Sequence, residues 1–396
     1  MKSLWVILAT LTLARTTMGF QFQSIAAVGP VFIDQSIITH TELGVLIGIY
    51  LLPGVLFAIP GGWLGQRFGD KRVVLFGLTM MMLGGALIAR FNTYEIMLFG
   101  RLISGLGAVL LNVLTTKMVA DWFAESRIAM AMGFLISSWP LGIAIALLIM
   151  GPLEQMIGLK WAFIVPVTVC AIALFLVLVI YTKPPGQAES AKVPTEIIDR
   201  KFTRYEFWGV VLSGCVWCFY NVAFILPLSF GPEYLVTKGL TITSAGAVVS
   251  LASWLIIPAL PLGALIAERI GRPFATMIVT FMAIAVLMGI FTITPFYAVI
   301  FALLGLIFGP AGGLIMALPA QVLSIEKRAV GMGVFFAIYY AGMGILPAIA
   351  GYALDISRNP AAPFILACVA ILFAALALVG FRVIQNKQRT NHAATQ

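Results

Sequence analysis

The chain has 396 residues, of which 61% are hydrophobic and 10% are charged, and its formal net charge is +9. Soluble domains carry about 25% charged residues, so this composition excludes an ordinary soluble protein and indicates helices in a lipid bilayer. Most cations occupy short segments between apolar runs, which argues against nucleic acid as a partner. The partners we expect are the lipid bilayer and a small solute.

Twelve apolar segments of about 20 residues follow one another, and each is long enough to cross a bilayer. The first begins after Lys2 like a signal peptide, but its apolar stretch is longer than a signal-peptide core, so we expect a membrane helix. The predicted spans are 4–31, 43–64, 73–90, 95–120, 128–150, 161–181, 207–231, 243–266, 274–294, 296–323, 329–354 and 361–384.

One long polar segment divides the chain. It contains Pro184, Pro185 and Gly186 and has the composition of a linker. The predicted domains are an N-terminal six-helix half at 1–181, a cytoplasmic linker at 182–206, a C-terminal six-helix half at 207–384 and a loose cytoplasmic tail at 385–396. Lys and Arg concentrate on the linker side, which predicts two cytoplasmic termini, and we expect the bacterial inner membrane as the location.

Two short hairpins between apolar runs share one pattern. Residues 62–72 read GWLGQRFGDKR, and residues 264–272, about two hundred positions later, read ALIAERIGR. In both, an apolar segment ends, an Arg follows a polar residue, and a Gly and further cations close the turn. Because the two copies have the same orientation, they predict two tandem halves, as in transporters built from parallel repeats.

The first hairpin resembles the G-x-L-a-D-R-x-G-R-R motif of the major facilitator superfamily. Gly62, Leu64, Arg67, Gly69 and Lys71 match it. The resemblance covers nearly the whole chain and implies an all-α membrane protein with about twelve helices in the major facilitator fold. It also implies gating or structural roles for Gly62, Gln66, Arg67, Gly69, Arg72, Arg101, Gly105, Glu268, Arg269 and Gly271.

The first hairpin departs from the family pattern at its acidic position. In the family, that acid makes a charge-assisted contact to a neighbouring helix and holds one end of the pore shut. Here the position is Gln66, while the second hairpin keeps the acid as Glu268. Either this latch is weaker in the first half, or Asp70 replaces it. A plain turn rich in cations is the alternative interpretation.

The fourth span contains a second family feature, R-x-x-x-G-x-G at residues 101–107. At 3.6 residues per turn, Arg101, Gly105, Ala108, Asn112 and Thr115 fall on one stripe of small and polar residues. Such a stripe suits either a cavity lining or close packing on a neighbour. For Arg101 a coupling role and a purely structural role both remain open.

Arg15 lies about eleven positions into the first span, where snorkelling to either membrane surface is difficult. An intramembrane cation costs about 2.5–3.5 kcal/mol on insertion scales, and no Asp or Glu occurs deep in any span to pair with it. We therefore expect an anionic substrate to complete the pair. The alternative is that Arg15 bonds helix-end carbonyls or side chains such as Gln21 and Gln23.

Further polar and aromatic residues lie in spans that line the cavity in the family, although each could equally serve packing. The predicted substrate-binding residues are Arg15, Tyr50, Asn112, Trp217, Asn221, Trp254 and Tyr340. Cys215 and Cys218 form a C-x-x-C inside an apolar run, which we interpret as packing. No metal site, cofactor or catalytic group is expected.

The sequence therefore predicts a monomeric secondary active or facilitative transporter that moves a small anion by alternating access. Residues 24–32, SIAAVGPVF, are similar to small-anion porters of the cyanate and nitrate kind. The alternative is a proton-coupled exporter of hydrophobic or cationic drugs, although residues 133–142, GFLISSWPLG, match the exporter motif only at Pro140 and Gly142. A channel or a non-transporting membrane sensor is less favoured, and no enzyme is expected.

Overall fold

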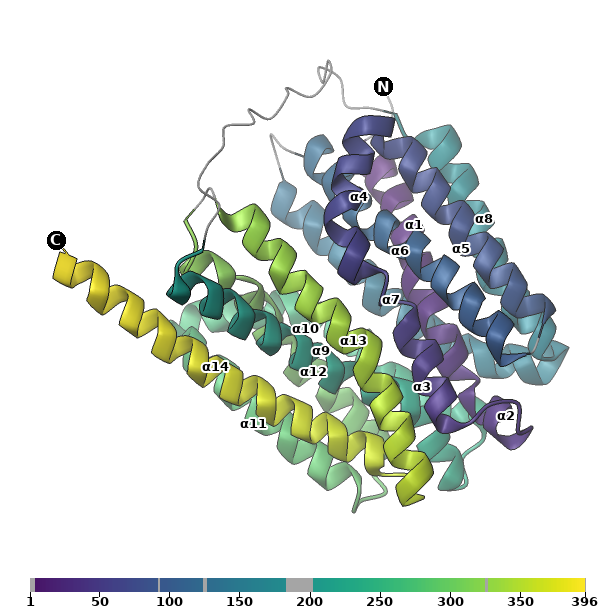
Figure 1. Ribbon diagram of the computed structural model, residues 1–396. Helices are drawn as coiled ribbons and strands as arrows, with labels where there is room; N and C mark the ends of the chain where they lie inside the picture. The colour runs from purple at the N-terminus through teal and green to yellow at the C-terminus, as the bar shows by residue number, and fades with distance from the viewer. Residues whose placement is uncertain (1–3, 92, 124–126, 183–201, 325–326, 396) are drawn as a thin grey trace.

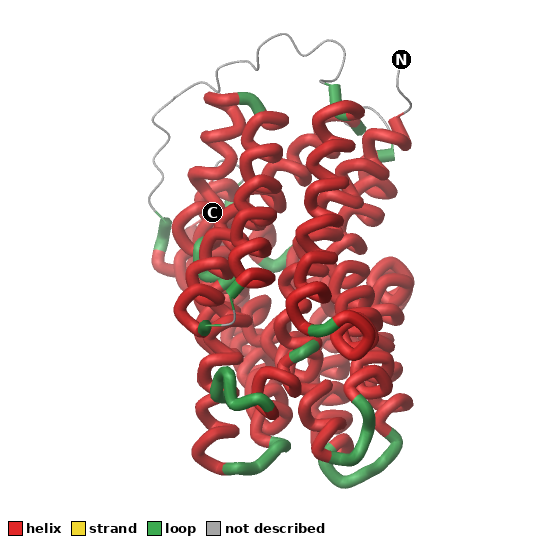
Figure 2. Tube along the Cα trace, turned by 90° about the vertical axis from the view of Figure 1, so that its right-hand side faces the viewer, coloured by secondary structure: helices red, strands yellow, loops and turns green. Residues whose placement is uncertain are grey.

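The computed structural model describes residues 4–91, 93–123, 127–182, 202–324 and 327–395, and these residues form helices joined by short connections (Figure 1). Figure 2 shows the helices lying side by side, with the connecting loops gathered mostly at the two ends of the molecule. Most of the predicted linker, residues 183–201, lies outside the described residues.

The twelve predicted spans correspond to the helices, with several extended ends and two interruptions. The first span breaks at Val28, directly before Gly29 and Pro30, and the second breaks ahead of Gly54. The N-terminal half consists of α1 (Leu4–Ala27), α2 (Gly29–Asp34), α3 (His40–Ile49), α4 (Gly54–Phe68), α5 (Asp70–Arg90), α6 (Tyr94–Trp122), α7 (Ile128–Ile157) and α8 (Leu159–Ile180).

The C-terminal half differs from expectation near its end. The predicted loose tail at 385–396 is wrong for its described part, because helix α14 continues through it to Thr395. The predicted tenth span ends early, at Met316, and a short 3₁₀ turn follows. The elements are α9 (Arg204–Thr237), α10 (Ile242–Ile270), α11 (Pro273–Phe291), α12 (Tyr297–Met316), the 3₁₀ turn Pro319–Gln321, α13 (Arg328–Ser357) and α14 (Ala362–Thr395).

Local sequence signals fix several helix boundaries. Thr39 and Glu42 form a capping box at the start of α3, and Thr203 and Glu206 form another at the start of α9, so backbone N–H groups that lack intrahelical partners are satisfied. Gly69 separates α4 from α5 with a φ of +88°, a conformation that strongly favours glycine. The first hairpin therefore turns within a single residue.

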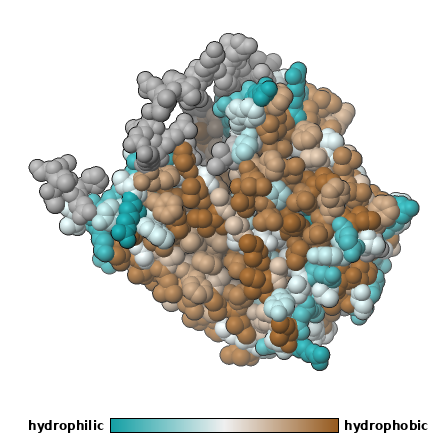
Figure 3. All heavy atoms as spheres, in the orientation of Figure 1, coloured by the Kyte–Doolittle hydropathy of each residue, from teal (hydrophilic) through white to brown (hydrophobic). Residues whose placement is uncertain are grey.

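Eleven helices of the described residues are long and apolar enough to cross a membrane. Helix α1 is not among them, and it carries the polar residues Arg15, Gln21 and Gln23. Both glutamines are buried, and their amides donate hydrogen bonds of 2.8 Å to the carbonyl oxygens of Met81 and Leu228. These two amide groups thus bond inside the protein, and α1 corresponds to most of the first predicted span. Figure 3 shows apolar residues over most of the visible surface, with polar residues toward its edges.

The two halves meet through α3 on α13 and α7 on α10. The approach is close: a Cβ added to Gly44 would lie 2.1 Å from the Pro347 carbonyl oxygen, and one added to Gly246 would lie 2.2 Å from that of Leu147. We call the end that carries the two hairpins the hairpin end, and the opposite end, where α3 begins, the far end. In Figure 1 the halves converge at the far end and diverge toward the hairpin end.

Replacement of Gly44 by Val should open the far end, because the added side chain cannot fit against the Pro347 carbonyl. A cysteine introduced at Thr243, in a variant without native cysteines, should then react severalfold faster with a membrane-impermeant thiol reagent. Gly133→Val is the matched control, since a Cβ at Gly133 meets nothing within 4 Å. Equal labelling rates in the two variants would contradict this account of closure.

Candidate functional site

Arg15 lies between the halves and is held by three neighbouring groups of the N-terminal half. Its Nε–H donates to Asn112 Oδ1 at 2.8 Å, and Nη1–H donates to the Leu135 carbonyl oxygen at 2.5 Å and to Ser138 Oγ at 3.2 Å. Asn112 in turn donates from Nδ2 to the hydroxyl of Tyr340 at 3.3 Å. This last bond crosses to α13, so the Arg15 group connects the two halves.

All the partners of Arg15 are neutral. None of the ion pairs in the described residues includes Arg15, and none includes Arg101. Within the described residues, Nη2 of Arg15 makes no hydrogen bond, and this nitrogen is not fully buried. The guanidinium therefore keeps its full positive charge and two free N–H donors, an arrangement that suits an anion.

An aromatic group from the C-terminal half faces this site. Tyr340 packs on Tyr339 with ring centroids 5.0 Å apart, and Tyr339 packs on Trp217 at 6.1 Å. Trp217 also stacks on Tyr220 and Phe335. Its Nε1–H is buried without a partner, and such a donor costs about 1–3 kcal/mol. The aromatic group thus extends from Tyr340, which Asn112 joins to Arg15, to an indole donor without a partner.

Arg101 occupies a different environment from Arg15. It is 0% exposed, and its Nε, Nη1 and Nη2 donate at 2.8, 2.8 and 3.0 Å to the carbonyl oxygens of Leu46, Gln21 and Phe22. Its guanidinium also lies 4.3 Å from the ring centroid of Tyr50. Each nitrogen thus has a partner, and the side chain ties α6 to α1 and α3. This geometry favours the structural alternative for Arg101.

The predicted substrate-binding residues divide into two groups. Arg15, Asn112 and Tyr340 are joined by hydrogen bonds, and Trp217 reaches them through Tyr339. The others lie apart: Asn221 donates to the carbonyl oxygen of Trp217, Tyr50 is buried against Arg101, and Trp254 is 37% exposed on α10. Arg15 does not bond Gln21 or Gln23, because its three hydrogen bonds go to Asn112, Ser138 and the carbonyl oxygen of Leu135.

The hairpin residues lie at one end of the molecule. Gln66 is exposed and makes no hydrogen bond within the described residues. Asp70 does not replace the missing acid across the halves, because its Oδ2 accepts from Lys117 Nζ at 2.5 Å within the N-terminal half. Gly62 is half-buried within α4. The remaining residues are exposed or occupy turns: Arg67, Gly69, Arg72, Glu268, Arg269 and Gly271.

The glycine of the fourth span has a packing function. A Cβ on Gly105 would lie 2.1 Å from the carbonyl oxygen of Tyr50, so α6 and the end of α3 are in backbone contact there. Only a residue without a side chain allows this approach. Because Gly105 lies one turn after Arg101, the same helix face combines close packing with the buried guanidinium.

Sequence reasoning missed three groups. Ser138 and the Leu135 carbonyl complete the Arg15 site, and nothing in an apolar run reveals which carbonyl is free to accept. At the far end, His40 contacts Glu233 and Asp355 of the other half. His40 is the first residue of α3. The sequence feature that could have drawn attention to His40 is the scarcity of histidine, since the chain has only two.

The described residues hold eleven helices long and apolar enough to cross a membrane, together with the more polar helix α1. They form two halves with a partly unpaired arginine between them, which indicates a membrane transporter of small solutes. The family model described as Major Facilitator Superfamily matches residues 11–347, and the chain belongs to this superfamily. The predictions of family and fold are therefore confirmed.

Individual relatives agree with this assignment. The chain is 24% identical to the hexuronate transporter of Bacillus subtilis (strain 168), covering 90% of this chain and 89% of that protein. A crystal structure of a mutant of nucleoside transporter NupG matches with a TM-score of 0.75 at 13% identity, over 96% of this chain and 99% of that chain. An inward-facing, unoccupied bacterial homologue of the human lysosomal transporter Spinster matches with a TM-score of 0.72 at 15% identity, over 96% of both chains.

Replacement of Arg101 by Gln should destabilise the fold, because it leaves buried carbonyl groups without their charged donor. We expect a loss on the order of 3 kcal/mol, measured as a lower midpoint of thermal unfolding in detergent. Arg15→Gln should lower the midpoint less, since Arg15 and Asn112 are only partly buried. Equal losses for the two variants would remove the distinction drawn between the arginines.

Replacement of Gln66 by Asp should favour closure of the hairpin end. A carboxylate there can pair with cations or helix N-terminal amides of the opposite half, which the neutral amide does less strongly. Cysteines placed near both hairpins should become less reactive toward thiol reagents in this variant. Gln66→Asn is the control of matched size. If both substitutions leave the reactivity unchanged, position 66 has no latch function.

Proposed function

We propose that this transporter carries a small organic anion by alternating access, with Arg15 as the principal charge partner of the substrate. The observation that carries the proposal is the set of partners around Arg15: a side-chain amide, a hydroxyl and a backbone carbonyl, with no carboxylate. A cation in a site of low effective dielectric attracts an anion strongly, and neutral partners do not cancel that field.

The hexuronate transporter supports the substrate class. A hexuronate is a sugar that carries a carboxylate, and the similarity to that protein extends over most of both chains. We expect the carboxylate of such a molecule at the free Nη2 of Arg15, which offers N–H donors. We expect its uncharged part against the aromatic group of Tyr340, Tyr339 and Trp217.

A solute bound at this site can also affect how the two halves are joined. The bond from Asn112 to Tyr340 joins α6 to α13, and Asn112 simultaneously holds Arg15. An anion that accepts from the free Nη2 of Arg15 and from the O–H of Tyr340 would join the two halves beside this bond. The substrate then has different contacts in the two conformations, which is the requirement for a ligand to shift a conformational equilibrium.

Arg15→Gln should reduce anion affinity about ten- to hundredfold, because a hydrogen bond to a charged group contributes about 1.5–3 kcal/mol. Arg15→Lys keeps the charge but loses the planar fork, and it should retain weak binding. Calorimetry or ligand-induced thermal stabilisation of purified protein measures both, with a panel of sugar acids, small carboxylates, inorganic anions and cationic drugs.

The control for this experiment is Arg67→Gln, which removes an exposed cation that stacks on Trp63 and Phe68 at the hairpin end. It should bind the panel as the unmodified protein does. Unchanged anion affinity in Arg15→Gln would reject the proposal. A cationic compound bound equally by the unmodified protein and both Arg15 variants would favour the drug-exporter alternative.

A further inference from the structure

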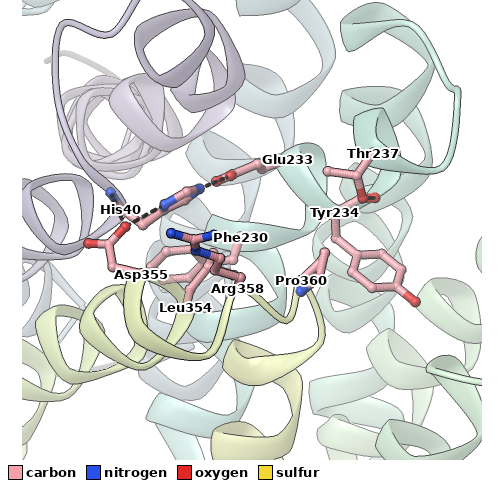
Figure 4. A pocket seen from close by; sticks show the side chains of 9 residues that line it. All are labelled: His40, Phe230, Glu233, Tyr234, Thr237, Leu354, Asp355, Arg358 and Pro360. Atoms are coloured by element: carbon pink, nitrogen blue, oxygen red, sulfur yellow. Dashed lines mark hydrogen bonds and ion pairs between the residues drawn. The ribbon is translucent and has the colours of Figure 1, made fainter.

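A histidine and two carboxylates meet across the halves at the far end (Figure 4). His40 opens α3 in the N-terminal half, while Glu233 on α9 and Asp355 on α13 belong to the C-terminal half. The imidazole Nδ1 lies 2.6 Å from Asp355 Oδ1, and Nε2 contacts Glu233 Oε1. Both ring nitrogens therefore face carboxylate oxygens of the opposite half.

This geometry sets the number of protons in the cluster. A neutral imidazole has one N–H and one lone pair, so it can donate to only one of the two carboxylates. The second contact needs another hydrogen, carried either by the ring as imidazolium or by one carboxyl group. In both cases the closed arrangement holds one proton more than a neutral histidine beside two ionised carboxylates.

The two carboxylates are not equivalent. Asp355 also accepts from the backbone N–H groups of His40 and Thr41, at 3.2 and 2.8 Å, and from Thr41 Oγ1 at 2.5 Å. It thus binds the N-terminus of α3 from the other half, where a negative charge is stabilised. Glu233 has no such support, because its Oε2 is buried without a partner. Within the described residues, its side chain has a polar contact only with the histidine.

Water can reach the cluster from a cavity of about 370 Å³ that His40, Glu233 and Asp355 line together with Tyr234 and Arg358. Two cations near the cluster, Arg358 and Lys238, are exposed. Arg358 directly follows α13, and the Lys238 Nζ lies 5.3 Å from the ring centroid of Tyr234. Glu42, on the helix of His40, is engaged in the capping box, and Asp34 ends α2 exposed. Within the described residues, no group of three or more His, Cys, Asp and Glu is arranged to hold a metal ion. The ligand that suits His40 and the two carboxylates is therefore a proton.

The backbone packing requires the cluster to form only when the halves are closed. A Cβ added to Gly351, one turn before Asp355, would lie 2.0 Å from the carbonyl oxygen of His40. Separation of α3 from α13 moves His40 away from both carboxylates at once. The imidazole and the carboxylates then return to water, where histidine loses its proton near neutral pH and carboxylates are ionised.

We propose that His40, Glu233 and Asp355 form a proton-binding site whose occupancy holds the far end of the transporter closed. Because the closed state binds one more proton than the open state, acid favours closure and alkali favours opening. The ratio of closed to open molecules should change by up to about tenfold per pH unit across the titration. The proposal goes beyond the anion function and rests only on the contact between the halves.

The test measures opening at the far end without any substrate. Spin labels at Gln155→Cys and Thr243→Cys, in a variant without native cysteines, report this opening, because these side chains face each other across the halves at 3.0 Å. In reconstituted unmodified protein, the short-distance population should fall as pH rises between about 5 and 9. In His40→Gln, which cannot titrate, the population should be the same at every pH.

Matched variants make the test specific. His392→Gln removes the other histidine of the chain and should preserve the full pH response. Glu233→Gln keeps the size of the side chain but not its charge, and it should flatten the response even if His40→Gln fails to fold. A pH response that persists in both His40→Gln and Glu233→Gln, or a missing response in the unmodified protein, would overturn the proposal. Neither result bears on the anion function, which is decided by binding to the Arg15 variants.

Discussion

The structure depends on how a guanidinium is satisfied inside a bilayer, where water offers no hydrogen bonds. Arg101 and Arg15 each make three hydrogen bonds to neutral groups. In Arg101 these bonds engage all three nitrogens, and the side chain is fully buried. In Arg15 they engage two nitrogens, Nη2 is free, and the side chain is half-buried. The same residue type thus holds the fold together in one place and leaves a nitrogen free for a ligand in another. That difference separates a structural arginine from one suited to a ligand.

Contact between the halves depends on glycine. At Gly44 and Gly246, the backbone of one half touches a carbonyl oxygen of the other, so α3 fits α13 and α7 fits α10 only without side chains. Such close packing involves van der Waals contact more than any hydrophobic driving force, which lipid would not supply. Each contact is individually weak and can be exchanged for lipid or water. A pair of halves that must separate and rejoin requires an interface of this kind.

Polar contacts cross between the halves at separate levels. Asn112 reaches Tyr340 near the centre, and His40 reaches Glu233 and Asp355 at the far end. A solute at the first level and a proton at the second would act on the same opening of the halves. Under the two proposals made here, linkage requires the affinity for solute to depend on pH and the affinity for protons to depend on solute.

The sequence by itself determined the membrane class, the two halves, the hairpins and the oddity of Arg15, because these follow from hydrophobic length, charge position and repetition along the chain. Spans were predictable since each apolar run must match the bilayer. Helix α14 extends beyond its predicted end. The apolar pattern that predicts a membrane span ends earlier, and a helix can continue through polar residues without it. The partners of Arg15 and Arg101 and the joining of His40 to residues about 190 and 310 positions later were decided only by the tertiary structure. Those contacts join segments that are far apart in the sequence, and pairing at such distances depends on how the helices pack, which no local pattern records.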